Sequence, residues 1–493
     1  MSLDQATIDK IIASVDNRQP APSSIAPPPQ PPVVHAPRQN EGQRHGPSPV
    51  SGTAMGIFGT VNEAIAAASH AFTERVRSDA DIAQIVEAIR SACRIHGEQL
   101  ARDAHDETGL GRPEHKIIKN DLVTEKTPGP EDLDTQAITG DDGLTMIEYA
   151  PYGVIGSITP TTNPTSTIIN NAIAMVAGGN AVVFNVHPSA RQVSVDTVRI
   201  LNKAIVSAGG PENLVVAIDP PTLQTAKDLM HHPDIALLLV TGGPGVVAEA
   251  LSTTKKAVTA GPGNPPTVVD ETADIDRAGR DIVRGASFDN NVICTDEKTT
   301  IVVDTVADSL IAAMQRAGAR LISADEWRLL EPSLFPHGLQ PAERNQVNAS
   351  WIGWDAARIL GEVGITCDQA APLAIVELPN DHPLVWSEQL MPIMPITRVH
   401  DVNAAIDLAA RSEHGYRHTA SMHSSDMGRI TAMARRMNCS IFVANGPNFA
   451  GLGSGGEGYT SFSIASPTGE GLTRPRTFCR ARRVTLVNAL NIV

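Results

Sequence analysis

The chain has no paired cysteines, no long apolar run and no basic cluster, and each absence excludes a class of protein. Its 5 cysteines are scattered over 493 residues, and none belongs to a Cys-x-x-Cys pair. We therefore expect neither a disulfide framework nor a structural zinc site. No apolar run approaches the roughly 18 residues that span a bilayer, and the first residues lack the pattern of a secretion signal. These absences predict a soluble, cytoplasmic protein with no membrane partner.

The balance of charge excludes a further class of partner. The formal net charge is −15, which argues against nucleic acid as a partner, and no long basic run contradicts this. Anionic cofactors would then depend on backbone amides and a few arginines. A chain of 493 residues is also long enough to form two or more domains.

The N-terminal region differs in composition from the rest. Residues 1–18 carry an apolar helical stripe formed by Ile8, Ile11, Ile12 and Val15. Residues 19–54 hold ten prolines, which favours an extended, solvated linker. Two interpretations are open: the helix docks on its own globular domain, or it is a targeting helix that binds another protein.

Short aliphatic segments alternate with helical ones from residue 154 onward. The expected strands cover 154–158, 181–184, 214–218 and 236–240, the first of them as the end of one apolar strand over 146–158. This alternation predicts an α/β fold with a doubly wound, Rossmann-like parallel sheet. Ligands of such sheets bind beyond the carboxyl ends of the strands. The turns expected there have the sequences TPTTNP, NVHPSA and TGGPG.

The last of these turns, at residues 241–245, can bring backbone N–H groups close to a phosphate at the start of a helix. It lacks the G-x-G-x-x-G spacing and the acidic residue that complete the usual dinucleotide motif. An ordinary glycine turn is the alternative interpretation.

Cys294 lies in the polar segment FDNNVICTDE, residues 288–297, directly after a helical stretch. A thiolate adds to a carbonyl carbon, and the resulting thiohemiacetal can release a hydride to become a thioester. The alternative is that Cys294 is a small buried hydrophobe.

Several motifs in combination resemble the aldehyde dehydrogenase superfamily over residues 55–493. They are PYGVIGSITPTTNP, HPSA, LLVTGGPGVV, AGPGNPP, GASFDNNVIC, SEQLMPIMPI and GEGYTSFSIASPTGEG. The chain looks most similar to the CoA-acylating branch, and within it to the propionaldehyde dehydrogenases of bacterial microcompartments. The resemblance implies an enzyme that uses NAD and coenzyme A to convert a small aliphatic aldehyde to its acyl-CoA.

The resemblance also implies a domain organisation. The NAD- and CoA-binding domain would cover residues 55–258, with 447–464 returning to it. The catalytic domain would cover 259–446. Segments 138–150 and 465–493 resemble the oligomerisation arms of the family, which implies a homodimer or a tetramer.

Carried over residue by residue, the resemblance makes Cys294 the nucleophile and Asn163 an oxyanion donor. The hydrolytic branch carries its asparagine one position earlier, where this chain has Thr162. The alternative for Asn163 is a capping or turn residue before Pro164. Glu388 corresponds to the glutamate that holds the nicotinamide ribose.

The other expected nucleotide contacts follow the strand ends, and the lysine that normally grips the adenosine ribose is missing. We expect NAD in preference to NADP. The remaining cofactor-binding positions are Thr162, Phe184, His187, Pro188, Thr241, Gly242, Gly243, Val246, Ala260 and Gly261.

Ala260 is the most informative departure from the hydrolytic relatives, which carry a glutamate there to activate water. Without that base the thioester should resist water and react with a thiol, which needs less activation. The sequence therefore favours acyl transfer to CoA, with propanal as substrate. Acetaldehyde as main substrate, a hydrolytic enzyme that releases free acid, a non-catalytic shell-bound scaffold and the reverse, reductive direction are the alternatives.

Two terminal features complete the expectations. Residues 1–18 resemble an encapsulation peptide, which implies binding to shell proteins and a place within a bacterial microcompartment. Five arginines near the C-terminus mostly alternate, so that on a strand four would share a face and contact a second subunit, solvent or the phosphates of CoA. They are Arg474, Arg476, Arg480, Arg482 and Arg483.

Overall fold

The computed structural model describes residues 55–75, 79–339 and 346–492. The expected targeting helix at 1–18 and the linker at 19–54 lie outside the described residues. Within the described part, no helix has both the length and the apolar character needed to cross a membrane.

The first sheet has six strands, and every neighbouring pair in it is parallel. Its central strands are fully buried, which explains their unbroken aliphatic sequences. The doubly wound parallel sheet predicted from the alternation is thus confirmed. In spatial order the strands are β1 (Ile57–Phe58), β6 (Val215–Ile218), β5 (Ala181–Asn185), β4 (Val154–Ile158), β7 (Leu237–Thr241) and β8 (Lys256–Ala260).

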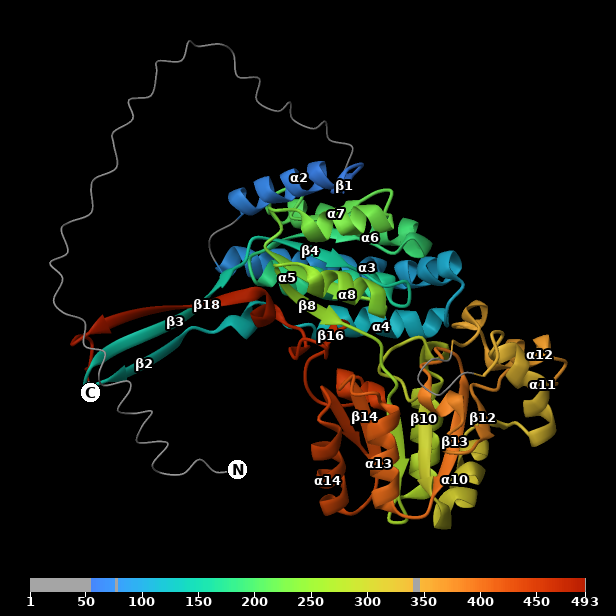
Figure 1. Cartoon of the computed structure of the whole chain (residues 1–493). Coiled ribbons are helices and arrows are strands. Elements are labelled where there is room, and N and C mark those ends of the chain that lie inside the picture. The colour runs from blue at the N-terminus through green and yellow to red at the C-terminus, as the bar shows by residue number, and fades with distance from the viewer. Residues whose placement is uncertain (1–54, 76–78, 340–345, 493) are drawn as a thin grey trace, which may run out of the picture. The chain divides into compact units, whose positions relative to one another are not determined.

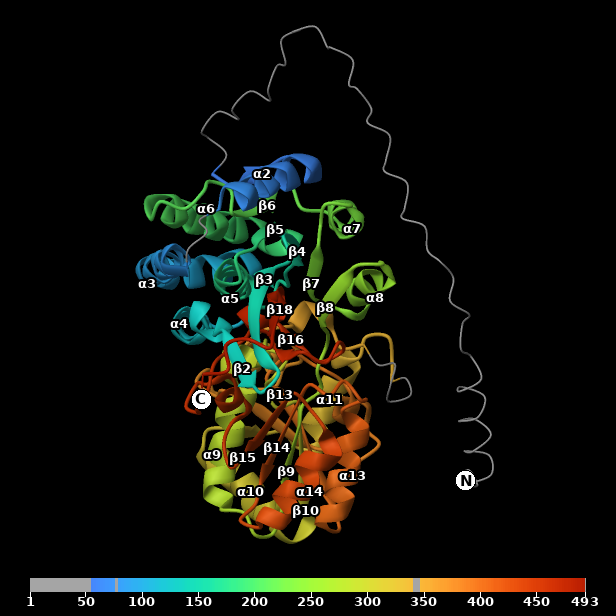
Figure 2. The same cartoon turned by 90° about the vertical axis from the view of Figure 1, so that its left-hand side faces the viewer.

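Helices cover both faces of this sheet (Figures 1 and 2). One layer holds α3 (Asp79–Thr108), α4 (Pro113–Lys126), α5 (Pro164–Ala177) and α6 (Arg191–Ser207). The other face carries α2 (Val61–Glu74), α7 (Leu223–His231) and α8 (Pro244–Ser252). Every residue of α5 is buried, and the helix ends at Gly178, as its glycine pair predicts.

A second parallel sheet forms the other lobe, drawn from yellow-green to orange in Figure 1. Its seven strands in spatial order are β11 (Arg320–Leu321), β12 (Ala374–Glu377), β13 (Ile393–Val399), β10 (Thr299–Val303), β9 (Pro266–Val269), β14 (Thr419–His423) and β15 (Ile441–Ala444). The helices of this lobe are α9 (Ile275–Ala286), α10 (Asp304–Arg316), α11 (Ala324–Leu334), α12 (Ala356–Glu362), α13 (Val402–Ser412) and α14 (Met427–Met437).

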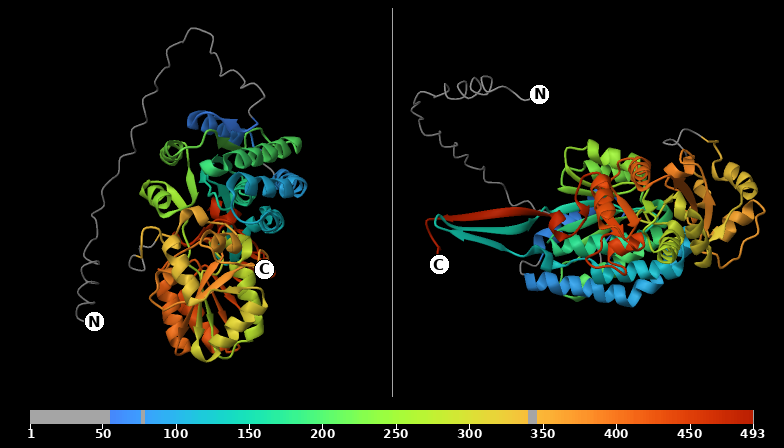
Figure 3. Two further views of the ribbon diagram at one scale, coloured as in Figure 1. Left: turned by 90° about the vertical axis from the view of Figure 1, so that its right-hand side faces the viewer. Right: turned by 90° about the horizontal axis from the view of Figure 1, so that it is seen from below.

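Three antiparallel strands form an arm that projects from the body of the protein (Figures 1 and 3). The middle strand, β3 (Gly143–Pro151), pairs with β2 (Gln136–Gly140) on one side and with β18 (Cys479–Val487) on the other. The outer edges of β2 and β18 have no partner among the described residues.

The prediction of one continuous strand over 146–158 is wrong, because β3 and β4 belong to different sheets. The chain turns between them at Gly153, which has a φ of +132° that glycine adopts without strain. The side chain of Asn180 accepts hydrogen bonds from the amides of Tyr152 and Gly153 at 2.8 and 3.1 Å. These bonds hold the corner between the arm and the sheet.

The expectation that four C-terminal arginines share one strand face is also wrong. Arg474 and Arg476 precede β18 and contact the same residue, Asp132. The Arg474 guanidinium lies 3.1 Å from the Asp132 carboxylate, and Arg476 donates to the Asp132 carbonyl at 2.7 Å. Only Arg480, Arg482 and Arg483 lie on the strand, where they are exposed. Arg474 and Arg476 do not continue the alternation because they lie in a turn that is bound to Asp132 at the base of the arm.

Candidate active site

A cavity of about 520 Å³ opens at the carboxyl ends of β4, β5 and β7. The three polar turns predicted at these strand ends all contribute to its wall. The second lobe supplies a thiol and a carboxylate from Cys294 and Glu388. The cavity therefore lies between these strand ends and residues 288–297, which we call the cysteine loop; we call the cavity itself the cleft.

The cysteine loop follows α9 and has an unusual backbone. Asp289, Asn290 and Asn291 have φ values of 48°, 55° and 67°, three left-handed residues in succession. Asparagine and aspartate tolerate this conformation better than most residues. Their buried side chains bond to neighbouring elements, for example Asn291 Nδ2 to the carbonyls of Ala286 and Glu297 at 2.8 and 3.0 Å. The polar side chains that are conspicuous in the sequence of this segment thus form the hydrogen bonds that fix the turn carrying Cys294.

Cys294 lies on the cleft wall and is half-buried. Burial and, to a smaller extent, the nearby Glu388 carboxylate raise the pKa of its thiol to about 12, while Lys298 acts in the opposite direction. The sulfur is therefore protonated at neutral pH in the protein without bound molecules. A nucleophilic role requires that a proton leaves it when a cationic or proton-accepting group arrives.

Asn163 and Thr162 also line the cleft. Asn163 is the residue before α5, but its side chain makes no capping bond to that helix. Its Oδ1 atom accepts from Lys119 Nζ at 2.7 Å, and its Nδ2 atom donates to Thr162 Oγ1 at 3.2 Å. The structure thus gives no support to the capping interpretation, and the amide is available to a ligand of the cleft.

Glu388 faces the cleft beside Leu390, and its Oε1 atom accepts a hydrogen bond from the Gly263 amide at 3.3 Å. Burial raises the pKa of the Glu388 carboxyl, and the Lys298 ammonium partly offsets this shift. No other carboxylate lines the cleft among the residues that the structure describes.

The glycine turn before α8 fits a phosphate group. Gly243 is the N-cap of α8, and no side chain caps this helix. Pro244 has no N–H, so the amides of Gly245 and Val246 are the donors that the helix start leaves for a ligand. A Cβ atom at Gly242 would lie 2.7 Å from Val246 Cγ1, whereas one at Gly243 or Gly245 would meet nothing within 4 Å. We call this turn the glycine cradle.

The structure gathers most of the predicted site residues around this cleft but leaves two of them away from its wall. Phe184 is fully buried within β5, and Ala260 ends β8 with 3% of its surface exposed. The predicted residues that line the cleft are Thr162, Asn163, His187, Pro188, Thr241, Gly242, Gly243, Val246, Gly261, Cys294 and Glu388.

Two further residues near the cysteine loop were missed in the sequence. Lys119 bonds to Asn163 across the interior, although a lysine in a helix is normally solvated. His418 is fully buried, with no partner for its Nε2 atom, and burial lowers its pKa to about 4. A Cβ atom built on Gly263 would lie 3.2 Å from this ring and 2.7 Å from the Cys294 carbonyl. A neutral imidazole therefore lies beside the loop, and no local sequence signal marks it.

Three wall residues lie outside every motif that the sequence offered. They are Thr222, Leu223 and Ala226, at the start of α7.

The cleft thus brings together the Cys294 thiol, the Asn163 amide and the glycine turn before α8. The model of the aldehyde dehydrogenase family matches residues 52–333 and 362–466. The chain belongs to the aldehyde dehydrogenase family.

Relatives within the family are similar over most of the chain. An acetylating acetaldehyde dehydrogenase of Salmonella typhimurium is 47% identical over 440 residues, which cover 89% of this chain and 94% of the relative. A CoA-propanoylating propanal dehydrogenase of the same organism is 44% identical over 447 residues, covering 90% and 95%. A propionaldehyde dehydrogenase of Rhodopseudomonas palustris, solved with bound CoA and an acylated cysteine, superposes with a TM-score of 0.86 at 47% identity and covers 89% of this chain and 100% of its own.

Proposed function

We propose that this aldehyde dehydrogenase converts propanal, CoA and NAD⁺ to propionyl-CoA and NADH. The observation that carries the proposal is the composition of the cleft, which joins the Cys294 thiol to a dinucleotide cradle and has Glu388 as its single carboxylate among the described residues. A hydrolytic enzyme needs a base that activates water, and position 260 supplies only a methyl group that does not reach the cleft wall. A thiol acceptor needs no such base.

The residues of the chain would act in the following order. Cys294 loses its proton and its sulfur attacks the carbonyl carbon of the aldehyde. The Asn163 amide and the backbone amide of Cys294 stabilise the alkoxide that forms. The backbone amides of the glycine cradle would hold NAD⁺, which would supply the hydride acceptor for this carbon. The product on the enzyme is a thioester of Cys294.

In the second half of the reaction the CoA sulfur attacks the thioester carbonyl, and the same amides stabilise the second alkoxide. The C–S bond to Cys294 then breaks, which gives propionyl-CoA and regenerates the cysteine. We propose that CoA reaches the thioester through the same cleft after NADH has left, because Cys294 lines this cleft. This order predicts ping-pong kinetics, and intersecting initial-rate patterns throughout would contradict it.

The proposal also specifies the chain length of the aldehyde, with propanal as the main substrate. Ile158, Leu390 and Phe462 line the cleft with Cys294 and provide an apolar surface for a short alkyl chain. One methylene group contributes only about 1–3 kcal/mol to discrimination. Acetaldehyde is therefore the second candidate substrate, in keeping with the acetylating relative.

The deciding experiment measures NADH formation from propanal with and without CoA, for the native protein and for Cys294→Ala. The proposal predicts turnover that requires both CoA and Cys294, with propionyl-CoA as the product. Full-rate turnover without CoA would make water the acceptor and would contradict the argument from position 260.

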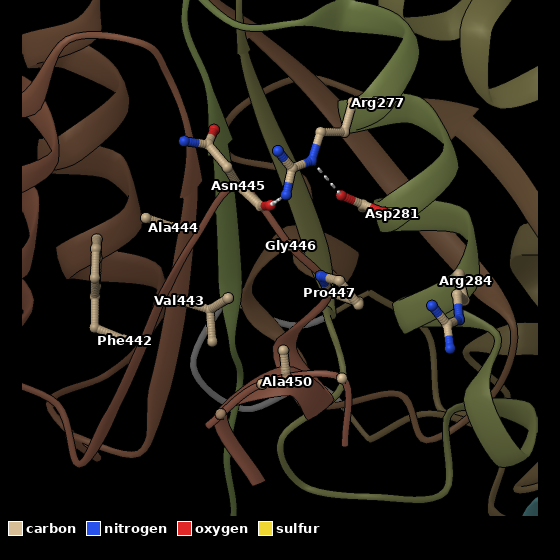
Figure 4. Close-up of a pocket in the computed structure, with 13 residues that line it drawn as sticks. Arg277, Asp281, Arg284, Phe442, Val443, Ala444, Asn445, Gly446, Pro447 and Ala450 are labelled. Carbon is tan, nitrogen blue, oxygen red and sulfur yellow. Dashed lines mark hydrogen bonds and ion pairs between the residues drawn. The ribbon is translucent and has the colours of Figure 1, made fainter. Parts of the chain in front are cut away.

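For the quaternary structure we propose that the arm of one copy joins the second sheet of another copy. The outer edges of β18 and β15 are both unpaired in the described chain. An open hollow of about 500 Å³ lies beside β15, lined by Phe442, Val443 and Asn445 and by Arg277 and Arg284 of α9 (Figure 4). Unpaired strand edges are ready to accept a further strand.

The apolar side chains of β18 support a second copy as the partner. Val484 and Leu486 lie on one side of β18 and are 56% and 42% exposed. The double variant Val484→Asp with Leu486→Asp should shift the protein to monomers in analytical ultracentrifugation. Leu329→Asp is the matched control, because Leu329 is 58% exposed on α11, away from the arm. A native protein that is monomeric at micromolar concentration would contradict this proposal.

We further propose the domain limits 55–258 with 447–464, 259–446, and arms at 138–150 and 465–493, together with a microcompartment location. A similar structure, 44% identical, belongs to the fucose utilisation microcompartment of Clostridium phytofermentans. Deletion of residues 1–18 should leave turnover intact and abolish co-purification with shell proteins. Unchanged encapsulation of the deletion variant would contradict the targeting role.

A further inference from the structure

The side chain of Lys119 joins Asn163 of the cleft lining to the loop that carries Cys294. It arises from α4 and is 2% exposed. Its Nζ atom lies 2.7 Å from Asn163 Oδ1, 2.5 Å from Asp289 Oδ2 and 3.0 Å from the carbonyl of Val292. An ammonium group has three N–H donors, so this lysine has a partner for each of them.

The chemistry of lysine decides which way the Asn163 amide points. Lysine can only donate hydrogen bonds, so the atom of Asn163 that faces Lys119 must be the carbonyl oxygen. The NH₂ group then points to the other side, where it donates to Thr162 Oγ1 at 3.2 Å on the cleft wall. A flipped amide would place its NH₂ group against the ammonium and its oxygen toward the substrate.

We propose that Lys119 is a positioning residue that holds the Asn163 amide with its N–H donors toward the aldehyde oxygen. The inference rests on the function proposed above, in which a negative charge develops on that oxygen. A donor stabilises this charge and an acceptor repels it. Without Lys119 the amide can rotate, and part of the enzyme population presents the wrong atom.

Lys116 provides a matched comparison within the same helix. It is buried to a similar degree, 4% exposed, and it also pairs with Asp289, at 3.0 Å from Oδ2. It makes no contact with the Asn163 side chain in the described structure, and its other bond, to the Thr162 carbonyl, is 3.5 Å long. Replacing either lysine should therefore disturb the charge balance around Asp289. Only the replacement of Lys119 should also free the Asn163 amide to rotate.

The first experiment compares Lys119→Met with Lys116→Met in CoA-dependent NADH formation. We expect kcat to fall about 10- to 100-fold for Lys119→Met, a part of the roughly 10²–10³-fold that one oxyanion donor contributes. For Lys116→Met we expect a change of less than about threefold. An equal loss in both variants would overturn the proposal, because charge balance would then explain it.

Alkylation of Cys294 by iodoacetamide distinguishes two possible effects of Lys119→Met: a change in the orientation of the Asn163 amide, and a displacement of the cysteine loop. This displacement reaction forms no oxyanion, so its rate should stay within about threefold of native in Lys119→Met while turnover falls. A parallel loss of alkylation would show that Lys119 acts on the cysteine loop and would overturn the proposal.

Variants of Asn163 keep the proposal testable should Lys119→Met fail to fold. Asn163→Asp keeps an oxygen for Lys119 and removes the donor, so its kcat should fall as far as that of Asn163→Ala. A native kcat in Asn163→Asp would overturn the proposal. In the double variant Lys119→Met with Asn163→Ala, the loss should not exceed that of Asn163→Ala alone, and additive losses would contradict action through the amide.

The native protein is assayed beside the variants. If it shows no CoA-dependent turnover, then the proposed function itself fails. If it does, then the variants test Lys119 alone.

Discussion

Glu297 Oε1 accepts a hydrogen bond from the backbone amide of Asn448 at 2.8 Å, which joins the cysteine loop to a segment 151 residues further along the chain. Asn448 returns a second bond from its side chain to the carbonyl of Thr295 at 2.9 Å. Both residues are fully buried. The segment after Cys294 is thus fixed by contacts that close only when the whole chain has folded.

Replacement of Glu297 should change how stability depends on pH. Burial raises the pKa of its carboxyl from an ordinary value near 4.5 to about 8. Between these values the folded protein keeps a proton that the unfolded chain has released, so stability falls as pH rises through this window. Glu297→Gln has no proton to release at this position. The difference in unfolding free energy between the variant and the native protein should therefore increase in favour of the variant by about 1.4 kcal/mol for each pH unit of rise in this window. Urea unfolding at several pH values measures it, and a constant difference between pH 5 and 8 would contradict it.

The reactivity of Cys294 in the protein without cofactor should report its raised pKa. With a thiol pKa of about 12, the rate of alkylation by iodoacetamide should rise about tenfold per pH unit from 7 to 10. A thiol with an ordinary pKa would level off near 8.5. Added NAD⁺ should accelerate the reaction at pH 7, because a positive ring beside the sulfur favours the thiolate. The rate is followed by mass spectrometry, with Cys294→Ala to subtract labelling of other thiols.

Asp289→Asn should destabilise the protein strongly. The carboxylate pairs with two buried ammonium groups, those of Lys116 and Lys119. Its removal leaves buried charge without compensation, a change that costs about 3–5 kcal/mol. Combining it with Lys116→Met should cost less than the sum of the two single changes, because one of the unpaired charges is then absent. Chemical denaturation of the four proteins measures the coupling, and strict additivity would contradict the pairing.

Gly285→Ala tests how tightly the cysteine loop packs against α9. A Cβ atom at this position would clash with the Glu297 carboxylate, and such overpacking costs about 1–3 kcal/mol. Gly361→Ala is the control, because a Cβ atom there meets nothing within 4 Å. That control should leave stability unchanged or raise it slightly, since alanine favours the helix. Equal melting temperatures for both variants would contradict the contact.

The elements that the sequence predicted well are those that local patterns determine. β4 and β7 are aliphatic runs bounded by turn residues, and the end of α5 is marked by its glycine pair. That Cys294 and Asn163 line one cleft agrees with the motifs of the family in which they stand. In each case the relevant information lies within about ten neighbouring residues.

The elements that the sequence did not predict depend on contacts between distant segments. Lys119 resembles any solvated helix lysine until Asp289, 170 positions later, is placed beside it. Arg474 looks like the start of an alternating strand, but Asp132 draws it into a turn at the base of the arm. The side of β5 that Phe184 faces could not be assigned either, because strands buried on both sides show no polar face.

The raised pKa of the half-buried Cys294 thiol also bears on the chemical lifetime of the enzyme. Peroxides and other oxidants attack the thiolate form of cysteine, so a thiol with a pKa of about 12 is oxidised slowly while no cofactor is bound. The raised pKa thus limits irreversible oxidation of the thiol between turnovers.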